Sequence, residues 1–195
     1  MARPRSYDSE TLALRTLTAF WQGGYHATSM DDLVRVTGVS RHGIYKEFGG
    51  KKDMFLSSFD LYQKLVVDPA FGQVEQRAAT IDDIAAYFEQ QIALAEQNGL
   101  PGPGCLVANS ATEVAPHDDD VQRKIDHHND RLRRGFASAI RNSVHGIPPR
   151  RCRQLAETVL VFATGLWALS RVTSSARDLR RVVATFLGMI EGELR

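Results

Sequence analysis

The stretch that decides the fold reads SMDDLVRVTGVSRHGIYKEF and covers residues 29–48. Ser29 and Asp32 have the spacing of a capping box, in which a hydroxyl and a carboxylate bind the free N–H groups at a helix start. Gly38 is expected to end this helix, because glycine readily adopts the positive φ of a helix C-terminus. Ser40 can then cap a second helix. The stretch therefore predicts two short helices joined by a tight turn.

The second of these helices divides its residues between two faces. Ile44 and Phe48 are four residues apart and can pack inward together. The outer face then carries donors from Arg41, His42, Tyr45 and Lys46. Such a helix suits the major groove of B-DNA, whose base edges accept hydrogen bonds from donors. A solvated helix of an ordinary bundle is the alternative that this spacing leaves open.

Outside this stretch the dominant period is also 3.6 residues, and no run alternates apolar and polar residues. An all-α fold is therefore predicted, with one buried stripe of Ala13, Leu17, Phe20 and Trp21 on the first helix. Longer helices follow residue 50, where we expect the boundary between a domain at 1–50 and one at 51–195. The expected helices span 8–22, 29–38, 40–48, 51–66, 70–78, 81–97, 105–114, 118–144, 150–173 and 176–193.

Composition excludes several protein classes. The chain has 195 residues, of which 43% are hydrophobic and 24% are charged, as in a globular protein. It has no apolar stretch that could span a bilayer and no export signal, so we expect a cytoplasmic protein with two reduced cysteines and no membrane partner. Residues 1–52 hold eight Lys/Arg against five Asp/Glu, while the remainder has a net charge of −2. A basic N-terminal end favours a polyanionic partner.

Two runs of the sequence resemble a known family. Residues 20–33 (FWQGGYHATSMDDL) and 38–55 (GVSRHGIYKEFGGKKDMF) closely resemble the N-terminal domain of TetR-family transcriptional regulators. The resemblance implies a homodimer with an N-terminal three-helix helix-turn-helix domain that binds a palindromic double-stranded DNA operator. It also implies a C-terminal helical domain for dimerisation and for a small-molecule effector that weakens DNA binding. Neither an enzymatic activity nor a cofactor is expected.

The same resemblance assigns DNA-contacting residues. The positions implied to meet bases or phosphates are Thr28, Ser29, Ser40, Arg41, His42, Tyr45, Lys46 and Lys51. Arg41 is the best candidate for reading guanine, since a guanidinium can donate two hydrogen bonds to that base. Lys46, Lys51 and Tyr45 are expected to position the protein on the phosphate backbone. Gly43 departs from the family pattern, which often has a hydroxyl there. Arg3 and Arg5 are candidates for a basic arm.

The last two expected helices carry the candidate dimer surface. Apolar residues recur there at three- and four-residue steps: Leu155, Val159, Phe162, Leu166, Val183, Phe186, Leu187 and Ile190. The resemblance implies that these helices pair with their symmetry mates as a four-helix bundle. The alternative is that both stripes face only the core of their own chain.

An effector pocket between the helices of the C-terminal domain is expected by analogy with the fold. The candidate lining residues are Tyr87, Phe88, Gln91, Cys105, Asn109, Glu113 and Trp167. The run Gly104-Cys105-Leu106 also resembles a TetR subgroup, some of whose members sense oxidants or electrophiles through this cysteine. A helix N-terminus lowers the pKa of a thiol, which favours such a switch.

Cys105 has two other possible roles, and two histidine-containing segments could suggest a metal site. A buried thiol that only packs is the plain alternative for Cys105, and a small cysteine enzyme is a remote one. A metal site at His117 and residues 118–120, or at His127 and His128, is not expected, because adjacent histidines on a helix diverge and the acids can cap a helix.

Overall fold

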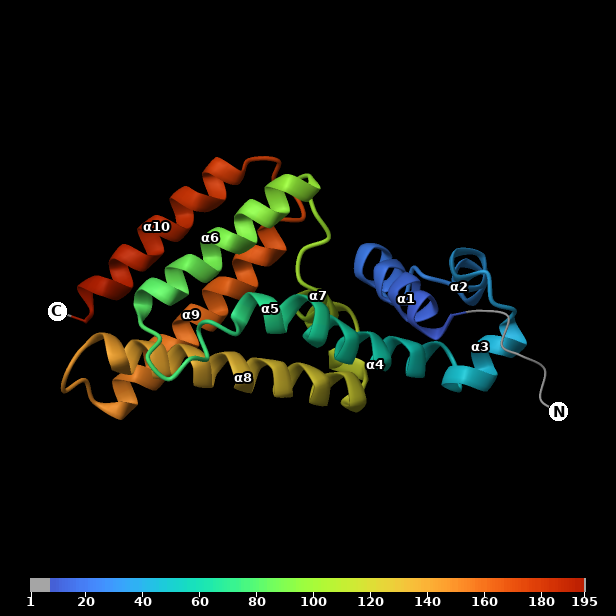
Figure 1. The fold of residues 1–195 in the computed structure, drawn as a ribbon, viewed down its shortest axis with the longest axis horizontal. Coiled ribbons are helices and arrows are strands. Elements are labelled where there is room, and N and C mark those ends of the chain that lie inside the picture. The colour runs from blue at the N-terminus through green and yellow to red at the C-terminus, as the bar shows by residue number, and fades with distance from the viewer. Residues whose placement is uncertain (1–7, 195) are drawn as a thin grey trace.

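The all-α fold is confirmed. The computed structural model describes residues 8–194, and these contain helices and turns but no strand. The helices are α1 (Ser9–Gly23), α2 (Met30–Thr37), α3 (Arg41–Phe48), α4 (Lys51–Tyr62), the π-helical turn η1 (Gln63–Val67), α5 (Asp68–Phe71), α6 (Ile81–Asn98), α7 (Leu106–Glu113), the 3₁₀ turn η2 (Ala115–His117), α8 (Asp119–Ser143), α9 (Pro149–Leu169) and α10 (Ala176–Gly192). In Figure 1, α1 to α3 lie at one end of the molecule and the C-terminus lies at the other.

The helix-turn-helix forms from the local signals that predict it. Ser29 caps α2 through a complete capping box with Asp32. Gly38 adopts the left-handed conformation, with φ 73° and ψ 7°, and its N–H binds the carbonyl of Val34. The Ser40 hydroxyl accepts a hydrogen bond from the N–H of Gly43 at the start of α3. These caps fix α3 at a defined angle to α2.

The N-terminal helices pack on α4. The buried side chains of α1 are Leu12, Thr16, Leu17 and Phe20. The ring of Phe20 meets that of Phe55 edge to face, with centroids 5.1 Å apart. The predicted stripe is therefore rotated slightly, since Ala13 and Trp21 are only half-buried.

One continuous helical rod joins the two ends of the molecule. The helix that begins at Lys51 does not end near residue 66, because η1 and α5 continue it to Phe71. The predicted separate helix at 70–78 was wrong, and residues 72–78 form turns and a bend. Because α4 contacts α1 as well as α7 and α8, it packs against both the N-terminal helices and the C-terminal part.

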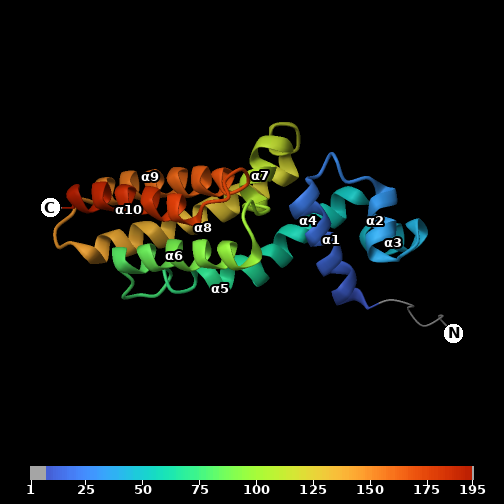
Figure 2. The same cartoon turned by 90° about the horizontal axis from the view of Figure 1, so that it is seen from above.

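The C-terminal part is a bundle of long helices. Helix α8 packs along α9, and α6 packs against α10. Aromatic rings fill the space between them: Phe71 meets Phe136 edge to face at 5.1 Å, and Phe162 stacks on Phe186 at 3.8 Å. Viewed from above, α9 and α10 run along one side of this part, and α5 lies on the opposite side (Figure 2).

The predicted dimer stripes mostly face the core of their own chain. Six of the eight side chains are buried within the single chain: Leu155, Val159, Leu166, Val183, Leu187 and Ile190. Phe162 and Phe186 are half-buried and stack on each other. Side chains enclosed in this way cannot also contact a second copy. The choice of these six residues as an interface is therefore corrected, whereas Phe162 and Phe186 remain partly exposed, and the opposite faces of α9 and α10 are also open.

Candidate nucleic-acid interface and ligand cavity

The outer face of α3 is open to solvent. Arg41, His42, Tyr45 and Lys46 are all exposed, and 51% of the Tyr45 surface remains accessible. Ile44 is completely buried on the opposite face, as predicted. The helix lies at the end of the molecule farthest from the C-terminus (Figure 1). Nothing among residues 8–194 covers this face, so a groove of DNA can reach it.

One exposed ion pair already engages the candidate base-reading residue. A guanidinium nitrogen of Arg41 lies 2.7 Å from a carboxylate oxygen of Asp31 on α2. Both side chains are largely exposed, so water and salt weaken the pair. Arg41 can therefore exchange this carboxylate for a base edge or a phosphate at little cost.

Two predicted DNA contacts have other roles in the structure. Thr28 is buried, and its hydroxyl donates to the carbonyl of Gly24 at 2.7 Å. Its side chain is thus not available to DNA, and this prediction is corrected. The Ser29 hydroxyl remains exposed but donates to Asp32 at 2.6 Å while it caps α2. Both hydroxyls hold the α1–α2 turn and the start of α2 in place.

Lys51 is less free than the sequence predicts. Its ammonium lies over the ring of Tyr25, 4.3 Å from the centroid, and the side chain is half-buried. Burial lowers the pKa of Lys51, and the nearby charge of Glu113 acts in the opposite direction. The lysine thus bridges the start of α4 and the α1–α2 turn.

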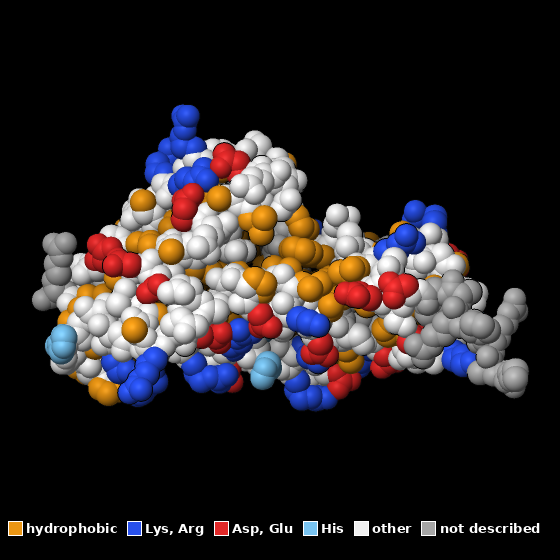
Figure 3. Space-filling view, in the orientation of Figure 1, with side chains coloured by type: hydrophobic (Ala, Val, Ile, Leu, Met, Phe, Trp, Pro, Cys, Tyr) orange, Lys and Arg blue, Asp and Glu red, His pale blue; other side chains and the backbone are white. Residues whose placement is uncertain are grey.

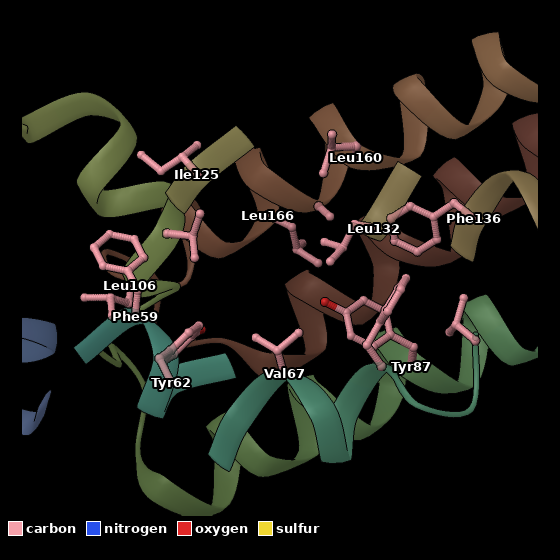
Figure 4. Close-up of a cluster of buried hydrophobic side chains, with 14 of the residues drawn as sticks. Phe59, Tyr62, Val67, Tyr87, Leu106, Ile125, Leu132, Phe136, Leu160 and Leu166 are labelled. Carbon is pink, nitrogen blue, oxygen red and sulfur yellow. The ribbon is translucent and has the colours of Figure 1, made fainter. Parts of the chain in front are cut away.

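A cavity of about 470 Å³ lies where the N-terminal helices meet the C-terminal bundle. It is lined by α1, the α4–α5 rod, the loop at 99–105 and α6 to α9. In the space-filling view, hydrophobic side chains gather around a hollow at this junction (Figure 3). Figure 4 shows Tyr62, Val67, Tyr87, Leu132 and Leu160 converging on one interior space from different helices. Its volume is that of a typical small-molecule site.

The structure brings four of the seven candidate pocket residues together. Tyr87, Gln91, Cys105 and Trp167 line the cavity. The other three lie elsewhere and are corrected. Phe88 is fully buried against Phe162, and the side-chain amide of Asn109 donates to the carbonyl of Pro103 at 2.9 Å. Glu113 points toward the N-terminal helices.

The surroundings of Cys105 in the cavity wall favour its protonated thiol. Burial raises the pKa of the Cys105 thiol, although hydrogen bonds from Tyr62 and from the N–H groups of Ala108 and Val107 act in the opposite direction. The predicted lowering of this pKa by the helix N-terminus is therefore wrong, because burial outweighs it. The thiol is protonated at neutral pH. Both cysteines are free.

Glu113 connects the ligand domain to the helix-turn-helix. Its carboxylate accepts hydrogen bonds from the N–H groups of Tyr25, at 3.1 Å, and His26, at 2.7 Å. These two N–H groups belong to the α1–α2 turn. A second contact joins the same parts, since the indole N–H of Trp21 donates to the carbonyl of Gly104 at 2.9 Å. The sequence carries no local signal for a contact between residues so far apart.

Gly24 makes the Glu113 contact possible. It adopts a φ of +83°, which disfavours other residues. A Cβ at this position would lie only 2.9 Å from a carboxylate oxygen of Glu113. The close approach of the turn to α7 therefore requires glycine.

His128 is the one buried histidine among residues 8–194. Burial lowers its pKa to about 4, and the positive charges of Arg131 and His127 contribute. Below about pH 6.5 the unfolded imidazole binds a proton that the folded one rejects, so the free energy of unfolding falls as the pH falls. We expect wild type to lose about 2 kcal/mol from this group between pH 7 and pH 5.

Denaturant unfolding at the two pH values checks this expectation. His128→Gln should lose about 2 kcal/mol less than wild type over that interval. His145→Gln is the matched control, because His145 is exposed and does not contribute to the pKa of His128, and it should behave like wild type. An equal pH dependence in wild type and His128→Gln would contradict the burial argument.

Three other expectations concern a metal site, a membrane-spanning helix and the basic arm. Within the described part of the chain, no group of three or more His, Cys, Asp or Glu side chains could hold a metal ion. None of the helices between residues 8 and 194 is long and apolar enough to cross a membrane. The candidate basic arm of Arg3 and Arg5 lies outside the described residues.

Comparisons with known proteins agree with this architecture. Residues 15–57 match the family model of bacterial regulatory proteins of the tetR family, and residues 78–185 match the C-terminal domain model of LmrA/YxaF-like transcriptional regulators. The HTH-type transcriptional repressor ComR of Escherichia coli is 24% identical over 188 residues, which are 95% of this chain and 90% of ComR. The uncharacterized HTH-type regulator YezE of Bacillus subtilis is 27% identical over 140 residues, 70% of each protein.

Solved structures share the fold. The TetR family regulator CifR, as a cysteine mutant complexed with 26-bp operator DNA, has a TM-score of 0.83 at 19% identity and covers 96% of this chain and 98% of its own. A TetR family regulator from Cytophaga hutchinsonii has a TM-score of 0.80 at 18% identity, covering 94% and 92%. With the two family models matched in order along the chain, this protein belongs to the TetR family of DNA-binding transcriptional regulators.

Proposed function

We propose that the protein is a homodimeric repressor that leaves a palindromic operator when a small molecule fills the cavity. The exposed outer face of α3 carries the DNA-binding part of this proposal. Its donors suit the major groove, and two copies must lie about 34–36 Å apart to enter successive grooves. The repressor role is supported by the likeness to ComR, which is named as a repressor.

The proposed dimer surface is the open side of α9 and α10. Apolar and small residues recur at steps of three and four along α9 and into the turn that follows it: Val161, Gly165 and Ala168 on the helix, and Val172 beyond its end at Leu169. Val161 is 64% exposed and Val172 is 76% exposed. On α10, Val182, Thr185, Gly188 and Met189 form a second exposed row. A Cβ on Gly165 or Gly188 would meet nothing within 4 Å, so helices of a second copy can approach closely there.

The proposed route from ligand to DNA passes through α7. Val107, Ala108 and Ala111 line the cavity from this helix, and Glu113 at its end holds the α1–α2 turn. A ligand that displaces α7 moves these hydrogen bonds, and with them the orientation of α3. Because Trp21 and Gln22 of α1 also line the cavity, the ligand contacts both parts directly.

The thiol-based alternative has less support. A redox or electrophile switch at Cys105 needs a reactive thiolate, whereas burial raises the pKa of this thiol. The position of Cys105 in the cavity wall instead favours a role in packing against a bound ligand.

Selection of bound sequences from random DNA duplexes tests the DNA-binding proposal. We expect a palindrome whose half-sites match the dimer spacing. With the selected duplex, Arg41→Ala should relax base preference at one position per half-site by roughly 1–3 kcal/mol. Lys46→Ala should weaken all sequences alike and reduce the salt slope by roughly one unit. Lys46 suits this comparison because its side chain is exposed, whereas that of Lys51 is half-buried. Equal, sequence-independent losses in both variants would contradict the role given to Arg41.

A further inference from the structure

The cavity wall has no formal charge. None of its lining residues is Asp, Glu, Lys or Arg. An ionic ligand would lose its hydration there without gaining an opposite charge, which is strongly unfavourable. Aromatic side chains also line the cavity, from Trp21, Tyr62, Tyr87 and Trp167. The wall therefore favours flat, uncharged molecules.

Both tyrosine hydroxyls of the cavity have polar protein neighbours. The neighbours of the Tyr62 hydroxyl are the thiol of Cys105 and the N–H of Leu106. The neighbour of the Tyr87 hydroxyl is the indole of Trp167. These neighbours shape the wall around the two tyrosines.

His128 is different, because one of its ring nitrogens remains available. The side chain is 94% buried and lines the cavity from α8. Its Nδ1 lies 2.9 Å from the side-chain amide nitrogen of Gln63, the first residue of η1. Nε2 has no hydrogen-bond partner among residues 8–194. Every side-chain nitrogen in this range that is sealed from solvent does have a partner, so Nε2 is not sealed. Solvent therefore reaches Nε2, on a side chain that lines the cavity.

Gln63 determines which nitrogen carries the proton. The amide nitrogen is closer to Nδ1 than the amide oxygen, which lies 3.3 Å away, and from this we infer that the amide donates to Nδ1. A neutral imidazole that accepts at Nδ1 carries its proton on Nε2. His128 thus presents an N–H donor to whatever enters the cavity. The π-helical turn that begins at Gln63 places this amide opposite α8, and such turns are frequent at functional sites.

We propose that the cavity binds an uncharged, aromatic molecule with a carbonyl or ether oxygen, and that this oxygen accepts a hydrogen bond from Nε2–H of His128. That such a ligand regulates DNA binding rests on the proposed function, whereas its binding to the cavity does not. Apolar walls supply most of the contact area, and the buried donor at His128 orients the ligand. A buried donor of this kind discriminates against molecules that lack the acceptor, because it is then left unpaired.

A series of naphthalene probes tests the proposal on the intact protein. The neutral ketone 6-propionyl-2-dimethylaminonaphthalene changes its emission when it enters an apolar site or receives a hydrogen bond. We expect it to bind with a blue-shifted emission. Analogues in which the propionyl group is replaced by a carboxylate, or the dimethylamino group by trimethylammonium, should bind at least about ten-fold more weakly. Equal or tighter binding of either charged analogue, or no binding of the ketone, would overturn the proposal.

The hydrogen bond has its own controls. The propyl analogue, in which a methylene replaces the carbonyl, should bind wild type about five-fold more weakly than the ketone, as expected for one lost hydrogen bond. His128→Phe should remove this preference, whereas Gln91→Leu, at another polar position of the wall, should keep it. If wild type binds ketone and propyl analogue equally, the role of His128 fails whether or not the variant folds.

Operator binding is measured separately with the same probes. If the ketone binds as expected but the operator complex is unaffected, the ligand class stands and the effector-release function fails. If the charged analogues bind preferentially and release the operator, the effector-release function stands and the ligand class fails.

Discussion

Gly188→Arg is expected to convert the dimer to a monomer and to weaken operator binding by at least about 100-fold. Gly188 lies on the exposed row of α10, where a Cβ meets nothing within 4 Å, so the single chain accommodates the substitution. In the proposed interface, the same substitution places a charged side chain between closely packed helices, which is strongly unfavourable. Each monomer then binds only one half-site and loses the benefit of the linked second site.

Analytical ultracentrifugation and fluorescence anisotropy with the selected duplex measure the two effects. Gln90→Arg is the matched control, because it adds the same charge at an exposed position of α6, and it should remain dimeric with nearly unchanged operator affinity. A Gly188→Arg protein that stays dimeric at micromolar concentration would refute the proposed surface, whatever its DNA affinity.

Glu113→Ala is expected to loosen the helix-turn-helix from the ligand domain. The variant loses two hydrogen bonds from backbone N–H groups to a carboxylate, so the free energy of unfolding should fall by about 2 kcal/mol. Amide hydrogen exchange at Tyr25 and His26 should become at least about ten-fold faster, since Glu113 binds both amides. Operator affinity should fall as well, because fewer molecules hold α3 in the arrangement that binds DNA.

Glu157→Ala supplies the control. Its carboxylate also binds another helix, through Arg133, but as an exposed ion pair, so less than about 1 kcal/mol should be lost. Unchanged exchange at Tyr25 and His26 in Glu113→Ala would show that the turn is held by other contacts, which contradicts the proposed coupling.

A double-mutant cycle tests whether the cavity acts through Glu113. Ala111→Phe enlarges a side chain on the cavity side of α7 and imitates a bound ligand. It should weaken operator binding in the wild-type background but have little further effect in Glu113→Ala. In the Glu157→Ala background its effect should be additive. Additivity with Glu113→Ala would place the coupling elsewhere.

The sequence was most informative where the determinants of structure are local. The capping box of Ser29 and Asp32, the turn at Gly38 and the inward Ile44 all follow from residues within a few positions of one another. The all-helical architecture follows from the same kind of periodicity. The exposed residues of α3 could be named because only one face of so short a helix can pack.

The remaining features depend on contacts distant in the sequence. Helices α9 and α10 are apolar or small on more than one face, so their periodicity does not determine which face meets α6 and α8 and which remains open. The partners of Glu113 are 87 and 88 residues away. The pKa of Cys105 depends on its burial among helices that the sequence does not position.

The chain contains two tryptophans, Trp21 and Trp167, and both indoles line the cavity. One comes from the DNA-binding end of the molecule and the other from the bundle. The tryptophan fluorescence of the protein therefore originates entirely at the walls of this cavity. Unlabelled compound libraries can be screened by their quenching of this signal, and the separate Trp21→Phe and Trp167→Phe proteins would reveal which wall a given compound touches.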